Sequence, residues 1–191
     1  MAYDAIRLDE RLTLRPPGVE DAQAICDIVE RDNVYLGKYL PWAETVPSLE
    51  DQTRYIETRI NRDSSFRNER SGNRSEWYAI QLDSELVGGI ELMISDLPGN
   101  KGELGYWLAS HVQGMGIITR AVQALTVLGF GELHLKAMWI YAETGNWPSR
   151  RVAERSGYVL QGEFPRKLHL RNDPVIMAGY FAISTEWELP N

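Results

Sequence analysis

The chain has 191 residues, of which 43% are hydrophobic and 25% are charged, and these proportions are typical of one folded domain. They exclude a disordered, collagen-like or low-complexity chain. The formal net charge of −7 disfavours a nucleic-acid-binding protein, because such proteins bind phosphates through an excess of Lys and Arg. One cysteine and three scattered histidines match no zinc-binding spacing. We therefore expect one domain over residues 1–191 that binds neither a metal nor nucleic acid.

Two further features of the composition concern location and partners. The sequence has no run of about 18 to 20 apolar residues, and no basic segment followed by an apolar one at its N-terminus. We therefore expect a cytoplasmic protein without membrane contact. Residues 1–100 carry 11 Lys and Arg against 19 Asp and Glu, whereas residues 101–191 carry 9 against 8. The acidic half is suited to a cationic partner, although such an excess of carboxylates also serves solubility alone.

The first third of the chain predicts a strand and two helices. Residues 11–15 alternate in polarity ahead of two prolines, which predicts a strand and then a turn. Apolar residues at helical spacing predict a helix over residues 20–31, with Cys26 in its buried stripe. Ser48 and the acidic residues after it predict a second helix that runs to about residue 62. Between the two helices, an aromatic-rich cluster either lines a pocket or packs the connection; it comprises Tyr35, Leu36, Tyr39, Leu40 and Trp42.

The middle of the chain predicts a loop followed by an antiparallel meander. Residues 61–75 are almost entirely polar, which is typical of a solvated loop. Residues 77–82 and 86–94 have the pattern of strands and are separated by a polar turn. After a Pro-Gly-Asn turn, residues 103–109 predict the next strand.

The second half predicts a helix, a strand and a short helix. Apolar spacing predicts a helix that begins after Gly116 and ends near Gly129 or Gly131. A strand over residues 137–142 and a short helix through Ser156 follow. The sequence shows no internal repeat of 20 to 50 residues, which excludes solenoids and propellers.

A loop with two glycines joins the strand over residues 103–109 to the helix after it. Its sequence is Gln113-Gly114-Met115-Gly116. Glycines let a ligand approach the backbone, and the free N–H groups of the following helical turn attract an anion such as a diphosphate. No lysine follows the glycines, which excludes a P-loop, and Thr119 stands where a dinucleotide fingerprint needs its third glycine. Alone, the loop is also explained as a tight turn between strand and helix.

Together these features resemble the GCN5-related N-acetyltransferases (GNAT), and within them the branch of RimJ- and RimL-type ribosomal-protein N-terminal acetyltransferases. Residues 113–118 are similar to the family's acyl-CoA loop, Q/R-x-x-G-x-G/A, with Ile118 in the last position. Residues 105–108 match the branch's G-Y-W-L, and residues 146–158 match its N-x-x-S-x-x-x-x-E-R-x-G-F/Y. Leu40-Pro41-Trp42 also looks like this branch, so the resemblance covers nearly the whole chain.

The resemblance implies a fold and a cosubstrate. The fold is a single α/β (α+β) domain with a central mixed, largely antiparallel twisted sheet flanked by helices. Acetyl-CoA would bind at the strand-loop-helix anion site, without a metal. The residues assigned to it by the resemblance are Trp107, Leu108, Gln113, Gly114, Met115, Gly116, Ile117, Ile118, Thr119, Asn146 and Ser149.

The resemblance also implies direct attack of an amine on the thioester, with backbone N–H groups near Trp107 and Leu108 holding the oxyanion. Ser149 matches the candidate acid for the leaving thiolate, although a serine at this position is also suited to capping a helix. Asn146 either contacts the pantetheine arm or holds the turn. For the proton of the amine we select Glu103, whose other reading is a surface carboxylate.

Several other residues remain candidates. Glu44, Glu91 and His169 are alternatives for the proton acceptor. Arg150, Arg151 and Arg155 either meet the phosphates of CoA or form a solvated helix face.

The acceptor is expected to be a primary amine, either a protein N-terminus of the ribosomal alanine or serine type or a small amine such as a polyamine. Residues 165–168 (Pro-Arg-Lys-Leu) stand where some relatives carry a general-base glutamate. This departure leaves open a non-catalytic acyl-CoA-binding or regulatory protein of the same fold. The sequence leaves open whether the chain is a monomer or a dimer, and only relatives suggest a homodimer.

Overall fold

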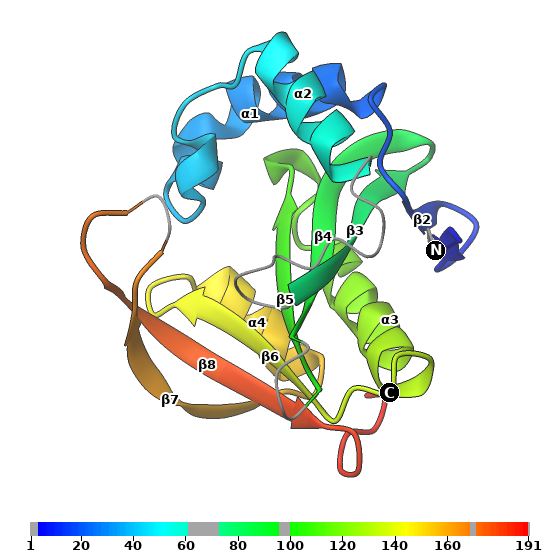
Figure 1. Cartoon of the computed structure of the whole chain (residues 1–191), viewed down its shortest axis with the longest axis vertical. Coiled ribbons are helices and arrows are strands. Elements are labelled where there is room, and N and C mark those ends of the chain that lie inside the picture. The colour runs from blue at the N-terminus through cyan, green and yellow to red at the C-terminus, as the bar shows by residue number, and fades with distance from the viewer. Residues whose placement is uncertain (1–3, 61–72, 96–99, 169–170, 191) are drawn as a thin grey trace.

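The computed structural model describes residues 4–60, 73–95, 100–168 and 171–190. Within these ranges the chain forms one eight-stranded sheet with four α-helices around it (Figure 1). The strands are β1 (Ile6–Arg7), β2 (Leu12–Arg15), β3 (Asn73–Leu82), β4 (Glu85–Ser95), β5 (Lys101–Leu108), β6 (Ala137–Glu143), β7 (Val159–Arg166) and β8 (Val175–Ile183). The helices are α1 (Asp21–Gly37), α2 (Leu49–Ile60), α3 (Ile117–Gly131) and α4 (Trp147–Arg155), with 3-10 turns η1 (Pro41–Ala43) and η2 (Ser110–Val112).

The sheet divides into two parts at the boundary between β5 and β6. Its order is β1-β2-β3-β4-β5-β6-β8-β7, and β5 and β6 form its one parallel pair among these strands. That pairing runs from Lys101 opposite Ala137 to Leu104 opposite Ile140. Beyond it, β5 continues along β4 and β6 continues along β8. The strands therefore leave a fork between them, and the expected mixed, largely antiparallel sheet is confirmed.

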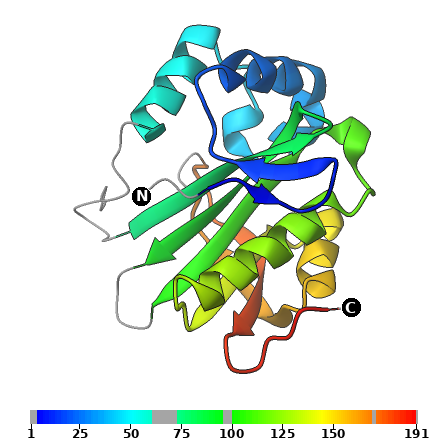
Figure 2. The ribbon, with the colours of Figure 1, turned by 90° about the vertical axis from the view of Figure 1, so that its right-hand side faces the viewer.

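Helices cover the two faces of the sheet unequally. α3 packs on β4, β5 and β6, while α4 packs on β6, β7 and β8, and the two helices contact each other (Figure 2). Under them lie Leu104, Met138 and Ile140, each no more than 3% exposed. Because side chains alternate along a strand, Glu103 and Trp139 point to the opposite face. That face is covered over β4 by α1, against which α2 packs.

Helix α1 is longer than the sequence pattern indicates. We expect a helix over residues 20–31, but α1 spans Asp21–Gly37. The apolar pattern weakens after Val29, because the added turns carry an exposed Val34 (88% exposed) next to a buried Asp32 (6%). The predicted burial of Cys26 is confirmed.

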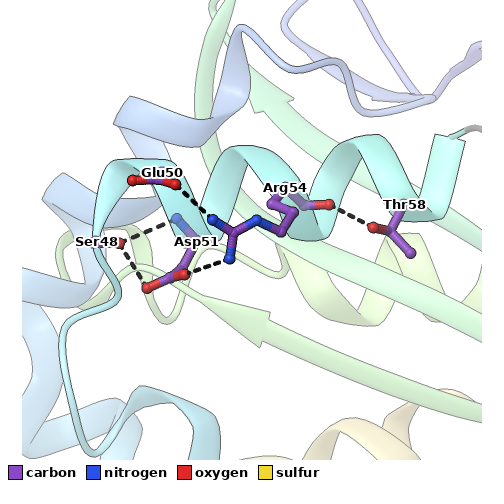
Figure 3. A network of polar contacts seen from close by, with 5 residues as sticks. All are labelled: Ser48, Glu50, Asp51, Arg54 and Thr58. Carbon is purple, nitrogen blue, oxygen red and sulfur yellow. Dashed lines mark hydrogen bonds and ion pairs between the residues drawn. The ribbon is translucent and has the colours of Figure 1, made fainter.

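Helix α2 begins where the sequence predicts, at a cap formed by Ser48 (Figure 3). The Ser48 hydroxyl oxygen accepts the backbone N–H of Asp51 at 3.1 Å and donates to the Asp51 carboxylate at 2.7 Å. Arg54 then bonds both Glu50 and Asp51, one turn earlier, at 2.6 and 3.1 Å. The Ser48 hydroxyl thus satisfies one free N–H group of the first turn, and the contact is local, which explains why this helix start is predictable from sequence.

The strands differ from expectation at several ends. The loop expected over residues 61–75 lies mostly outside the described residues, but β3 already begins at Asn73, so residues 73–75 belong to the sheet. The antiparallel meander of β3, β4 and β5 is confirmed.

In the part of the chain that the structure describes, no helix is long and apolar enough to cross a membrane.

Candidate active site

The loop between η2 and α3 places two glycines in the left-handed region of backbone conformation. Gly114 and Gly116 have φ of 76° and 74°, and a Cβ built on either would meet no atom within 4 Å. Both glycines therefore turn toward open space. Gly116 caps α3 without a side-chain hydrogen bond, so the first N–H groups of the helix stay available. The buried hydroxyl of Thr119 has no hydrogen-bond partner among the described residues.

A cavity opens in front of this loop, at the fork between β5 and β6. It is lined by α1, the end of β5, the glycine loop, the first turn of α3 and the first turns of α4. Ten of the residues expected at the acetyl-CoA site line it; they are Trp107, Leu108, Gln113, Gly114, Gly116, Ile117, Ile118, Thr119, Asn146 and Ser149. Met115, the other expected residue, is not among the lining residues and is 52% exposed.

The start of α4 brings Ser149 against a buried tyrosine. The Ser149 hydroxyl lies 3.0 Å from the Tyr106 hydroxyl, which also donates to the Ser149 carbonyl at 3.2 Å. Burial raises the pKa of Tyr106 far above neutrality, so this phenol stays protonated. Asn146 caps α4, because its side-chain oxygen accepts the Ser149 N–H at 3.3 Å. The capping role thus falls to Asn146, and the Ser149 hydroxyl faces the cavity with Tyr106.

The connection between α1 and α2 forms one wall of the cavity. Tyr35, Leu36, Tyr39 and Leu40 line it, as one of the two sequence interpretations requires. Trp42 packs edge-on against Trp107, with ring centroids 5.8 Å apart.

A buried carboxylate beneath the loop was not predicted from the sequence. Asp32, on α1, accepts hydrogen bonds from both the N–H and the hydroxyl of Ser110, each at 2.8 Å. Arg31 also bonds this carboxylate, and Arg31 contacts His111 at 3.1 Å. Asp32 therefore fixes the turn η2 that leads into the glycine loop. Its only sequence signal is a charged residue at a helical position that continues the buried stripe.

Glu103 does not line the cavity. It lies on the opposite face of β5, and it pairs with Arg166 at 2.7 Å. The Arg166 guanidinium stacks over the Tyr141 ring, 4.1 Å from its centroid. The Glu103 carboxylate is 30% exposed, so it stands at the surface of the sheet beside a groove.

The alternative proton acceptors are also engaged or lie elsewhere. Glu91 pairs with Arg59 at 2.5 Å on the same sheet face as Glu103. Glu44 lies 3.4 Å from Arg171. His169 falls outside the described residues.

The three arginines of α4 have different surroundings. Arg150 is 8% exposed and donates to the Tyr180 hydroxyl and the Thr144 carbonyl, both at 3.0 Å, so it belongs to the interior of the fold. The expectation that it either meets phosphates or lies on a solvated face is therefore wrong. Arg151 is exposed, and Arg155 lines the cavity.

The residues present fit acetyl-CoA. Two open glycines, the unpaired Thr119 hydroxyl and the free helix N-terminus suit a diphosphate, and Arg155 adds a positive charge at the same cavity. Among the described residues, no group of three or more His, Cys, Asp or Glu is placed to hold a metal ion.

Comparisons with known proteins agree with this geometry. Residues 11–159 match the family model described as an acetyltransferase (GNAT) domain. The chain is 32% identical to a "putative ribosomal N-acetyltransferase YdaF" of Bacillus subtilis over 182 residues, covering 95% of this chain and 96% of the relative. It is 26% identical to a "ribosomal-protein-serine acetyltransferase" of Escherichia coli, covering 83% and 85%.

The fold likewise matches solved structures. RimL, a ribosomal L7/L12 alpha-N-protein acetyltransferase solved in complex with coenzyme A, superposes with a TM-score of 0.80 at 23% identity over 94% of this chain and 98% of the other. A structure named a probable acetyltransferase superposes with a TM-score of 0.83 at 27% identity, over 96% and 98%. The chain belongs to the GNAT acetyltransferase family, as an acetyl-CoA-dependent N-acetyltransferase of the RimJ and RimL type.

Proposed function

We propose that this enzyme acetylates the N-terminal amine of a protein, with ribosomal proteins as the first candidates. The observation that carries the proposal is the match over nearly the full chain to relatives named for ribosomal acetyl transfer. The cavity supports it, because the Ser149 and Tyr106 hydroxyls meet there beside the glycine loop. Named acetyltransferases among the relatives also speak for catalysis and against a non-catalytic acyl-CoA-binding protein.

We assign the proton for the leaving sulfur to Ser149. Its hydroxyl lies on the cavity side of α4, where its 3.0 Å contact with the Tyr106 hydroxyl positions it. As the C–S bond breaks, the Ser149 proton passes to the sulfur, and solvent in the cavity restores it. Burial raises the pKa of Tyr106 and disfavours its anion, so this phenol stays protonated and holds the serine by hydrogen bonding without giving up its proton.

We assign the developing negative charge on the acetyl oxygen to the N–H of Leu108. Ala109 donates its N–H to Val87 of β4 at 2.8 Å. Because N–H groups alternate in direction along an antiparallel strand, the N–H of Leu108 points to the other edge of β5, toward the fork. A donor placed in this way typically contributes about 10²–10³ in rate. In the same proposal, Gln113 to Thr119 hold the diphosphate and Asn146 contacts the pantetheine arm.

We keep Glu103 as the proposed acceptor of the amine's proton, acting through water because it lies outside the cavity. Glu103→Gln is then expected to lower kcat by about 10²-fold and to remove the acidic limb of the pH–rate profile. Steady-state kinetics between pH 5 and 9 measure both. A profile that keeps its acidic limb in the variant eliminates Glu103 from this role.

A small polycationic acceptor is less well supported than a protein N-terminus. On the sheet face opposite α3 and α4, Glu91 pairs with Arg59 and Glu103 pairs with Arg166. Both negative charges are thus partly neutralised, which weakens the attraction of this face for a polycation.

The deciding experiment compares acceptors. Peptides that begin with Ser or Ala, the same peptides with a blocked N-terminus and an internal Lys, and spermidine are incubated with the enzyme and acetyl-CoA. Mass spectrometry is expected to show one acetyl group on the free N-terminus alone. Acetylation of spermidine or of the internal Lys, without the free N-terminus, contradicts the proposal.

Three further expectations belong to the same proposal. We place the enzyme in the cytoplasm, where ribosomal proteins and acetyl-CoA are found together. We treat residues 1–191 as one functional unit, and a homodimer remains a prediction.

A further inference from the structure

Glu143 lies close to residues of two hollows, one along the chain and one across the sheet. It is the last residue of β6, three residues before Asn146 of the cavity described above. Its cross-strand neighbour Met177 lines a second groove, on the sheet face that α3 and α4 leave uncovered, together with Trp139, Tyr141, Phe164, Pro165 and Arg166. Glu143 therefore neighbours the groove through Met177 and the cavity through the short segment that leads to Asn146.

The carboxylate of Glu143 is less well satisfied than those of Glu91 and Glu103. Glu91 and Glu103 bond their arginines at 2.5 and 2.7 Å. One oxygen of Glu143 is shielded from solvent and accepts no hydrogen bond from any described residue, and its nearest guanidinium, that of Arg171, is 3.9 Å away. A buried anionic oxygen without a donor is costly to maintain, which points to a ligand that supplies one.

Arg171 is shared and does not complete the bonding of Glu143. The same Nη2 donates to the Lys38 carbonyl at 3.1 Å and lies 3.4 Å from Glu44. Its buried Nε has no hydrogen-bond partner among the described residues. Nearby, the Tyr39 hydroxyl donates to the Gly145 carbonyl at 3.0 Å. The connection after α1 therefore bonds both Arg171 and Gly145, but these contacts leave the buried oxygen of Glu143 without a hydrogen bond from the described residues.

We propose that Glu143 binds the protonated N-terminal amine of the acceptor, whose following residues lie in the second groove. The inference rests on the proposed function and names the group that recognises its substrate. An ammonium carries three donors and can bond the free oxygen of Glu143 while leaving Arg171 in place. The position of Glu143, three residues before Asn146, supports this occupant, since an amine bound there lies near the proposed acetyl site. Glu143 binds the amine, whereas the proton that the amine loses before its attack passes to Glu103 through water, as proposed above.

The test measures recognition of the amine itself. A peptide beginning with Ser and its desamino analogue, which lacks the amine, are titrated calorimetrically into enzyme saturated with CoA, where no turnover occurs. Wild-type enzyme is expected to bind the amine-bearing peptide about 10- to 100-fold more tightly, the range of one charge-assisted hydrogen bond. Glu143→Gln should bind the two peptides within twofold of each other, with unchanged affinity for acetyl-CoA.

Two variants control the test. Glu163→Gln removes another strand carboxylate that lies beside an arginine, 3.4 Å from Arg150, and should discriminate like wild type. Glu143→Asp keeps the charge on a shorter side chain and should fall between wild type and Glu143→Gln, which guards against a variant that fails to fold.

The outcomes separate the two proposals. Discrimination of tenfold or more in a folded Glu143→Gln overturns this inference while leaving N-terminal acetylation intact. Wild-type enzyme that binds acetyl-CoA yet neither binds nor acetylates the peptide overturns both.

Discussion

The contact with Tyr106 positions the hydroxyl of Ser149, the proposed acid, in a way that the motif around Ser149 does not reveal. Tyr106 lies on β5 and Ser149 on α4, 43 positions apart, yet their hydroxyls are 3.0 Å apart. The serine alone is a weak acid with an ordinary alternative role as a cap. Here Asn146 caps the helix, and the hydroxyl of Ser149 is left for the cavity.

The pair can be tested by a double-mutant cycle. Ser149→Ala is expected to lower kcat by about 10²-fold or more, because it removes the proposed donor. Tyr106→Phe should cost about 2- to 10-fold, the range of one hydrogen bond. The double variant should match Ser149→Ala, since Tyr106 acts only through the serine. Steady-state kinetics provide the readout, with the exposed Ser184→Ala as control, and additive losses would contradict this coupling.

The ionised carboxylate of Asp32 makes the stability of the protein at low pH depend on the turn that leads into the glycine loop. Burial opposes ionisation of this carboxyl, but the bonds from Arg31 and Ser110 outweigh it, so the pKa of Asp32 lies below its usual range. A carboxyl with a lowered folded-state pKa stabilises the protein above its unfolded pKa of about 3.9 and loses this contribution as the pH falls through the folded value.

Asp32→Asn is therefore expected to destabilise the protein at pH 7 by about 1–3 kcal/mol, the cost of breaking a buried bond to a charged group. The difference from wild type should shrink below pH 4, where wild type loses the same contribution. Urea unfolding at pH 7 and at pH 3.5 measures both. Asp27→Asn, an exposed residue of the same helix, serves as control, and a gap that stays constant with pH would rule out the ionised carboxylate as the cause.

At the scale of elements, the glycines at the two ends of α3 have different roles. Gly116 precedes the helix with a φ of 74° and faces open space, whereas Gly131 ends the helix without a positive φ. The first is required by its positive φ, and the proposed binding of a diphosphate also needs the open space in front of it. The second only weakens the helix, because glycine costs backbone entropy.

Gly116→Glu is expected to reduce acetyl-CoA affinity by about 100-fold or more, since a carboxylate would repel the diphosphate from the helix N-terminus. Gly131→Ala should keep the affinity and raise stability by about 0.5–1 kcal/mol. Isothermal titration with acetyl-CoA and thermal unfolding measure the two effects. Undiminished affinity in Gly116→Glu would move the diphosphate site away from this loop.

The elements that could be predicted from sequence are those with local signals. The Ser48 cap, the glycine loop and the meander depend on neighbouring residues. β8 could not be recognised by alternation because it lies between β6 and β7, with Met177, Ala178, Tyr180 and Ala182 all buried. The end of α1 was missed because Asp32 is buried by contacts with a turn 78 positions later.

The whole molecule explains why the site was predicted in part. The motif residues gather at the fork because β5, the glycine loop and α3 are consecutive in the chain. The state of each carboxylate depends instead on partners far away in sequence, such as Arg166 for Glu103, 63 positions on. Sequence supplies the candidates for acid and base. The arginine that pairs with Glu103 is identified only from the folded structure, because β5 and β7 belong to different parts of the sheet.

Because the cavity joins α1, β5, α3 and α4, binding of acetyl-CoA should stabilise the folded chain as a unit. Unfolding separates these elements and destroys the site, so at a ligand concentration of 100 times Kd the stabilisation is about 2.7 kcal/mol. For a chain of this length that corresponds to a rise in Tm of about 5 to 11 °C. Differential scanning calorimetry is expected to show this rise with acetyl-CoA and CoA, and none with NAD or ATP. Gly116→Glu should lose the rise while keeping a cooperative transition, and a full rise in that variant would show that the ligand stabilises the fold from somewhere other than the fork.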